Sequence, residues 1–136
     1  MNQTVLAVGA LIVLLLLVFG TSFLLKRKPR KLNQTYYQDR WQALQGLLKE
    51  KATWPLAVID ADKLLDDALK RSKYKGKTMG ERLVSAQRDI KNNDNVWFGH
   101  KLRNRLVHEE KVKLRERDVK DALMGIRAAL KDLGAL

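Results

Sequence analysis

Residues 5–25, VLAVGALIVLLLLVFGTSFLL, constrain this chain most, because 21 successive residues carry no charge. As one α-helix they would extend about 30 Å, the thickness of the hydrocarbon core of a bilayer. A cleavable signal peptide is the alternative, but it carries positive charge before its apolar core and a small-residue cleavage site after it. Here only the terminal amine precedes the run, and KRKPRK follows at once. We therefore predict an extracytoplasmic N-terminus and an uncleaved single transmembrane helix in residues 1–25.

A cluster of basic residues follows the apolar run, and no acidic residue occurs before Asp39. The cluster consists of Lys26, Arg27, Lys28, Arg30 and Lys31. Because cationic flanks stay on the cytoplasmic side, this pattern predicts a single-pass protein of the cell membrane with a cytoplasmic C-terminal domain. Juxtamembrane cations also attract anionic headgroups, each by about 1 kcal/mol. We expect residues 26–33 to form a basic linker whose five cations contact anionic lipid.

The overall charge favours anionic partners. The formal net charge is +12, from 27 basic and 15 acidic residues, and the chain after the basic cluster still has 22 basic residues against those 15. Such an excess is typical of proteins that bind nucleic acid or lipid headgroups. The chain has no cysteine, which excludes disulfides, thiolate metal sites and a cysteine nucleophile.

Residues 34–136 have a helical period almost throughout and no two-residue alternation typical of a strand. Three apolar stripes carry this period: Tyr37, Trp41, Leu44 and Leu48; Ala57, Ala61, Leu64, Leu65 and Ala68; and Val119, Ala122, Leu123, Ile126, Leu130 and Leu133. The fold class is therefore all-α, a single transmembrane helix followed by a compact cytoplasmic bundle of four to five helices.

Local signals place the helix ends. Pro55 suits a first helical turn, and Thr78 with Glu81 forms a capping box for a short helix. Asp94 or Asn95 can cap the helix that follows KNNDN. Gly134 ends the last helix.

The helix that contains HKLRNRLVHEE, residues 100–110, holds both histidines. At about 100° per residue, Phe98, Leu102 and Leu106 fall on one face, which we predict to be the core face. Asn104 and His108 lie opposite, with Arg103 on the near flank. Trp97 and Val107 share this outward side, which suggests that a partner, such as a second copy, covers it.

The pattern Arg103-Asn104-x-x-x-His108 resembles the Arg-polar-x(3)-His signature of the HEPN superfamily. Its members are all-α domains, often dimeric, and many are metal-independent endoribonucleases. The resemblance implies catalytic roles for Arg103, Asn104 and His108 in a composite site across a homodimer interface, with no metal and no cofactor. His100, one turn before Asn104, is a supporting candidate. The segments WPLAVIDADKLLDDAL and HKLRNRLVHE also resemble small membrane-anchored bacterial proteins, a likeness that implies no activity.

These residue types suit RNA cleavage by the neighbouring 2′-hydroxyl. Histidine exchanges protons near neutral pH, and arginine supplies a permanent cation for the extra charge on phosphate. The proposed partners are the membrane, RNA and a second copy; no protein partner is named by the sequence. A non-catalytic, membrane-tethered interaction module is the alternative, and plain electrostatic binding of nucleic acid is a third. In the plainest interpretation these are surface cations and polar residues near a helix end.

Two other patterns are interpreted as structural. The four-residue pairs Lys63–Asp67, Asp66–Lys70 and Asp67–Arg71 predict a solvated, ion-paired face for DADKLLDD, including Asp60 and Asp62, rather than a cation site. The tryptophans Trp41, Trp54 and Trp97 are assigned to core or interface packing rather than to base stacking.

Overall fold

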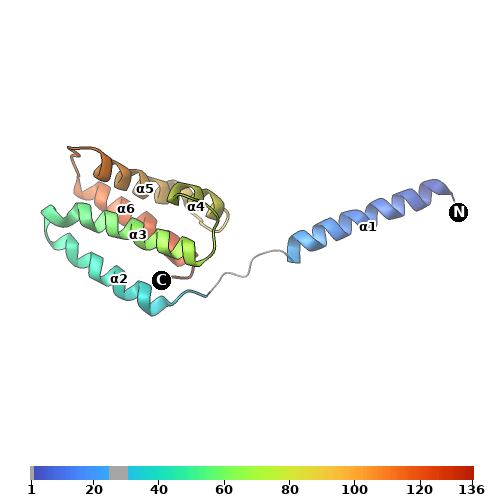
Figure 1. Cartoon of the computed structure of the whole chain (residues 1–136), viewed down its shortest axis with the longest axis horizontal. Coiled ribbons are helices and arrows are strands. Elements are labelled where there is room, and N and C mark those ends of the chain that lie inside the picture. The colour runs from blue at the N-terminus through green and yellow to red at the C-terminus, as the bar shows by residue number, and fades with distance from the viewer. Residues whose placement is uncertain (1, 25–30) are drawn as a thin grey trace.

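The computed structural model describes residues 2–24 and 31–136, and within these residues it is helical with no strand (Figure 1). This confirms the all-α class. After the N-terminal helix α1 (Gln3–Leu24) come five α-helices and two 3-10 helices, somewhat more helical segments than the four to five expected. Of the five predicted lipid-contacting cations, only Lys31 lies within the described residues; residues 26–30 lie outside them.

Helix α1 has 22 residues and is therefore about 33 Å long. The side chains described along it are exposed, including Leu16 and Phe19. Within the described chain it is the one helix long and apolar enough to cross a membrane. So many exposed leucines and valines would be unfavourable in water, because burial of each such side chain is worth about 1.5–3 kcal/mol.

The bundle begins with α2 (Gln34–Gly46) and continues through η1 (Leu47–Lys49) and η2 (Lys51–Thr53) into α3 (Trp54–Arg71). The Asn33 side chain caps α2 by accepting a hydrogen bond from the Tyr36 amide at 3.2 Å. Pro55 lies in the first turn of α3, as predicted. The 3-10 turns are fixed by side chains, since Trp54 Nε1 donates to the Leu48 carbonyl at 3.0 Å.

Three further helices complete the bundle: α4 (Met79–Ala86), α5 (Asn93–His108) and α6 (Glu116–Asp132). Thr78 caps α4, as predicted, by accepting from the Glu81 amide. The predicted cap of α5 is wrong: Asn92, rather than Asp94 or Asn95, accepts from a backbone amide in the first turn. Gly134 takes a left-handed φ of 76° just past α6, as its role as a terminator requires.

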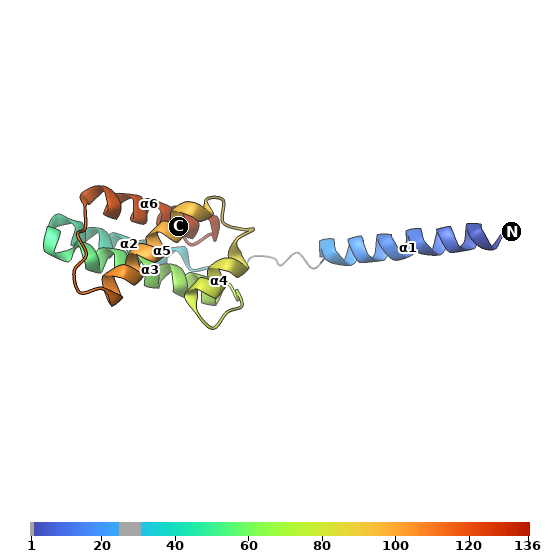
Figure 2. The same ribbon diagram turned by 90° about the horizontal axis from the view of Figure 1, so that it is seen from above.

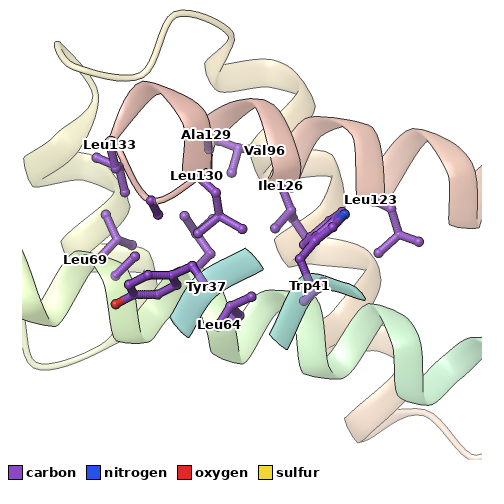
Figure 3. Packing of buried hydrophobic residues seen from close by; sticks show 14 of the residues in the cluster. Tyr37, Trp41, Leu64, Leu69, Val96, Leu123, Ile126, Ala129, Leu130 and Leu133 are labelled. Atoms are coloured by element: carbon purple, nitrogen blue, oxygen red, sulfur yellow. The ribbon is translucent and has the colours of Figure 1, made fainter. Parts of the chain in front are cut away.

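The core lies between α2, α3 and α6, with α5 closing one side (Figure 3). Tyr37 and Trp41 of α2 lie between α3 and α6, next to Leu130 and Ile126 of α6, and all four are buried. Trp41 therefore packs in the core, as predicted. Trp54 and Trp97 are half-buried against the same core.

Helices α5 and α6 approach very closely at two glycines. A Cβ at Gly99 would lie 3.0 Å from Ile126 Cδ1 and 3.1 Å from the Ala122 carbonyl oxygen, and a Cβ at Gly125 would overlap the backbone carbonyl of Asn95. This contact fixes the rotation of α5 about its axis, and therefore decides which of its side chains meet α3.

An arginine joins helix α4 to α3, in addition to the burial of Leu83 and Ala86 in the core. Arg82, which is 7 % exposed, donates from Nε and Nη2 to the two carboxylate oxygens of Asp66 at 2.7 and 3.0 Å, and from Nη1 to the Gly76 carbonyl at 2.8 Å. In Figure 2, α4 lies at the end of the bundle where α2 begins.

Candidate functional site

Four polar side chains from α3 and α5 form a closed cluster. His100 Nδ1 lies 3.0 Å from Asp62 Oδ1, and His100 Nε2 lies 3.4 Å from Asn104 Nδ2. Arg103 Nη1 donates to Asn104 Oδ1 at 3.0 Å, and Arg103 Nε lies 3.5 Å from Asp62 Oδ2. We call Asp62, His100, Arg103 and Asn104 the α3–α5 polar cluster.

The cluster follows from helical spacing and from the packing of α5. Three and four residues separate His100 from Arg103 and Asn104, so these side chains are neighbours on one side of α5. Because α5 packs against α6 at its glycine, the side of α5 that carries these three residues faces α3 and contacts Asp62. Asp62 is 2 % exposed and His100 8 %, so the pair lies beneath the surface.

Two predictions are corrected here. Asp62 was assigned to a solvated face but is buried, because His100 and Arg103 supply partners for its carboxylate. Phe98 was placed on the core face but is 40 % exposed, while His100 is buried. Leu102 is buried, as predicted, and the core face of α5 also contains Val96 and Gly99.

The hydrogen bonds determine the form of the imidazole. An ionised Asp62 only accepts hydrogen bonds, so Nδ1 of His100 carries the proton. Nε2 of the neutral ring is then an acceptor for the Asn104 amide, and it becomes a donor once the ring is protonated. A carboxylate that orients a histidine in this way is common where histidine exchanges protons.

Arg103 is partly committed and partly available. Its side chain is 28 % exposed. Its Nε is buried without a hydrogen bond although it lies in ion-pair range of Asp62. Within the described part of the chain its Nη2 also makes no hydrogen bond, so the guanidinium retains donors for an anion.

Helix α4 and Trp97 border the imidazole. Trp97 packs edge-on against His100, with ring centroids 5.7 Å apart. A Cβ built on Gly80, near the start of α4, would lie 4.0 Å from His100 Nε2 and 3.6 Å from the Trp97 ring. The acceptor nitrogen of His100 thus lies between Asn104 and the first turn of α4.

His108 lies apart from the cluster. It is the last residue of α5 and is exposed, and its side chain forms no hydrogen bond or ion pair within the described residues. A single copy of the chain therefore brings together Arg103, Asn104 and His100, the weaker histidine candidate, and does not join His108 to them.

Asp62 is the cluster residue that the sequence interpretation missed. A signal was present: Val58, Asp62, Leu65 and Leu69 are spaced by four, three and four residues along the buried stripe of α3. A carboxylate inside such a stripe requires a cationic or donor partner from another element.

The ion pairs predicted around Asp62 are mostly present. Asp66 pairs with Lys70 and Asp67 with Arg71, each at 2.9 Å, whereas Lys63–Asp67 is not among the ion pairs of the described residues. Within those residues no group of three or more His, Asp and Glu side chains is arranged to hold a metal ion.

Family models, curated proteins and solved structures contain no match to this chain.

Proposed function

We propose that the chain is a membrane-anchored, HEPN-like module that binds RNA and cleaves it without metal. The observation that carries the proposal is the α3–α5 polar cluster, in which a carboxylate-oriented histidine and a partly available arginine lie side by side. Helix α1 would span the cell membrane with the N-terminus outside, and the bundle would lie in the cytoplasm.

The roles follow from the chemistry of each group. A neutral histidine nitrogen takes the proton of the ribose 2′-hydroxyl, whose oxygen attacks the adjacent phosphorus, and the 5′-oxygen leaves with a proton. Arg103 binds the phosphate oxygens and stabilises their extra negative charge. The Asn104–His100 contact of 3.4 Å is long for a hydrogen bond. A ribose hydroxyl can replace the Asn104 amide there.

A homodimer supplies the second histidine. His108 projects from the end of α5, and Val107 beside it is 48 % exposed. If two copies pack through α5, His108 of one copy approaches Arg103 of the other, as the family resemblance implies. The two histidines then act as base and acid on opposite sides of one phosphate.

The dimer is tested by sedimentation of the full chain in neutral detergent. We expect a dimer that Val107→Glu converts to a monomer, because a charge would be placed in an apolar contact. Met124→Glu is the matched control, since Met124 is 69 % exposed on α6. A wild type that stays monomeric at all concentrations contradicts the dimer.

Cleavage is tested on the same preparation in EDTA with a mixed-sequence RNA. Arg103→Ala, His100→Ala and His108→Ala should each lower the rate at least a hundredfold, the loss expected for a proton-transfer or charge-stabilising group. Arg117→Ala removes an arginine that is 86 % exposed on α6 and should change nothing. Equal rates for all four variants and wild type would end the nuclease proposal.

A non-catalytic interaction module is the second candidate. The mutual hydrogen bonding of the cluster favours it, because the sole role of such a network can be to hold α5 against α3. In that case the protein neither binds nor cleaves RNA, and the effect of Asn104→Ala is a lower free energy of unfolding. RNA retention on immobilised wild-type protein, compared at low and high salt, separates the two candidates.

A further inference from the structure

A hollow of about 530 Å³ lies at the end of α3, away from the α3–α5 polar cluster. It is lined by Lys31, Leu32, Asn33, Asp67, Lys70, Arg71 and Lys73. Four of these side chains are cationic and one is a carboxylate. The cations come from three places, the linker, the last turn of α3 and the residues after it, so their convergence is a property of the fold.

The single carboxylate is already neutralised. Asp67 Oδ2 accepts a hydrogen bond from the Tyr37 hydroxyl at 2.8 Å and another from Arg71 Nε at 2.9 Å. Because the phenol is buried and, to a smaller extent, because it donates to this carboxylate, the pKa of Tyr37 is raised above its ordinary value. With four cations against this one carboxylate, the lining of the hollow keeps a net positive charge.

Arg71 is held ready for an anion. Its guanidinium lies over the Tyr36 ring, 5.5 Å from the centroid. Its Nε is committed to Asp67, but its two terminal nitrogens make no hydrogen bond within the described residues. These two nitrogens present the planar fork that suits phosphate oxygens.

Lys70 can be redirected at little cost. Its Nζ lies 2.9 Å from Asp66 Oδ2, and its side chain is 58 % exposed. Asp66 keeps two hydrogen bonds from Arg82 when Lys70 turns away. An exposed pair of this kind contributes little stability.

Lys73 occupies a position that favours glycine. Its φ is 64°, the left-handed region just past the end of α3. A residue with a Cβ is less stable there than glycine by about 1 kcal/mol. The lysine thus places a cation on the hollow at the expense of backbone stability.

The hollow must lie near the membrane surface if α1 spans the bilayer. Lys31 is seven positions after Leu24, the end of α1, and a fully extended chain over seven steps covers at most about 25 Å. Figures 1 and 2 place the start of α2 and the end of α3 at one end of the bundle, and the connection between α5 and α6 at the other. That distant connection mixes Glu109 and Glu110 with Lys111 and Lys113.

We propose that this hollow binds the phosphodiester headgroup of an anionic glycerophospholipid from the leaflet into which the linker emerges. The proposal rests on the membrane-spanning role of α1 and is independent of the nuclease. Such a lipid orients the bundle on the membrane, with Lys31, Lys70 and Arg71 around its phosphate and the α3–α5 polar cluster away from the contact.

The test uses the full chain in nanodiscs of phosphatidylcholine with an increasing fraction of phosphatidylglycerol. Amide hydrogen exchange is measured in peptides covering residues 31–36 and 67–76. We expect phosphatidylglycerol to slow exchange in both. In Lys31→Gln/Lys70→Gln the lipid fraction for half-maximal slowing should rise at least tenfold, since each cation near the surface contributes about fivefold.

Two further variants separate specific binding from general charge and from unfolding. Lys111→Gln/Lys113→Gln lowers the net charge equally at the distant end and should bind as wild type does. Lys73→Gly relieves the left-handed strain while removing a cation, so weaker binding together with an unchanged melting temperature is assigned to the lost charge.

Several results would overturn the proposal. One is that phosphatidylcholine alone gives the same slowing of exchange. Another is that Lys111→Gln/Lys113→Gln weakens lipid binding as much as Lys31→Gln/Lys70→Gln does. Inorganic phosphate added to phosphatidylcholine discs could reproduce the slowing, which would make the hollow a site for free anions. Failure of the chain to enter nanodiscs at all would instead contradict the membrane-spanning role of α1, on which the lipid site rests. That outcome is distinguishable from loss of the lipid site alone.

Discussion

Nδ1 of His100 and Oδ1 of Asp62 lie 3.0 Å apart, joining two helices across 38 residues of sequence. Both residues are buried, so this contact is the polar centre of the α3–α5 packing. It fixes which nitrogen of the imidazole faces Asn104.

Replacing Asp62 with Asn should reverse the tautomer. The amide nitrogen of Asn donates to Nδ1, so the proton moves to Nε2 and the acceptor nitrogen next to Asn104 is lost. We expect ¹⁵N chemical shifts of the imidazole to report the exchange, with a loss of about 1–3 kcal/mol in the free energy of unfolding. Asp60→Asn, at an exposed neighbour, is the control and should alter neither. An unchanged tautomer would mean that Asp62 does not orient the ring.

The closest contact between α5 and α6 predicts a glycine-specific effect. Gly125→Ala places a methyl group against the Asn95 carbonyl, so one helix must shift, at a cost of about 1–3 kcal/mol or more. Gly46→Ala meets nothing within 4 Å and lies in a helical conformation, so it should be neutral or slightly stabilising. Thermal unfolding of both variants checks this, and an equal response would show that α5 and α6 are farther apart.

Asp66 predicts a particular acid sensitivity. Burial raises the pKa of Asp66, but hydrogen bonds from Arg82 and Lys70 outweigh burial and hold the pKa below its ordinary value. A depressed folded-state pKa gives stability that is fully present above the unfolded-state pKa of about 3.9 and is lost as pH falls through the folded value. Urea unfolding at a series of pH values from 7 to 2 should show this loss.

Arg82→Gln should shift that acid loss to higher pH, because it removes the two hydrogen bonds that stabilise the ionised carboxylate. Arg105→Gln is the matched control, since Arg105 pairs with Glu109 on the surface with its side chain 55 % exposed. Identical pH profiles for the two variants would contradict the role of Arg82.

The proposed topology can be tested cleanly, because the chain contains no cysteine. We expect Asn2→Cys to react with a membrane-impermeant maleimide on intact cells, and Lys113→Cys to react only after lysis. Labelling of Lys113→Cys but not Asn2→Cys on intact cells would indicate the opposite orientation. Labelling of both variants would argue against a spanning helix.

The helices were predictable from the sequence, whereas the orientation of α5 was not. Periodicity located α3 and α6 because each carries a long apolar stripe. Pro55 marked the start of α3, and Gly134 marked the end of α6. On α5 the apolar residues are few, and Phe98 was assigned to the core because it shares one face of the helical wheel with Leu102 and Leu106. The close approach at Gly99 decided the orientation instead, and that depends on Ile126 of another helix.

The site was only half predictable for a related reason. Arg103, Asn104 and His100 share one helix, so their proximity follows from spacing. The burial of His100 depends on Asp62, 38 residues earlier, and a helical wheel contains no information about such a partner. Asp62 itself could have been suspected, because Val58 and Leu65 place it within a buried stripe.

The guanidinium of Arg82 has a wider effect than its position suggests. Helix α4 has eight residues, too few to remain helical in water without tertiary contacts. Its persistence therefore depends on tertiary contacts, which are the fork that ties it to Asp66 and Gly76 and the burial of its apolar side in the core. Because Gly80 at its start adjoins Nε2 of His100, these contacts also hold in place the helix that borders the imidazole. An ion pair that does not touch that nitrogen thus contributes to shielding it from solvent.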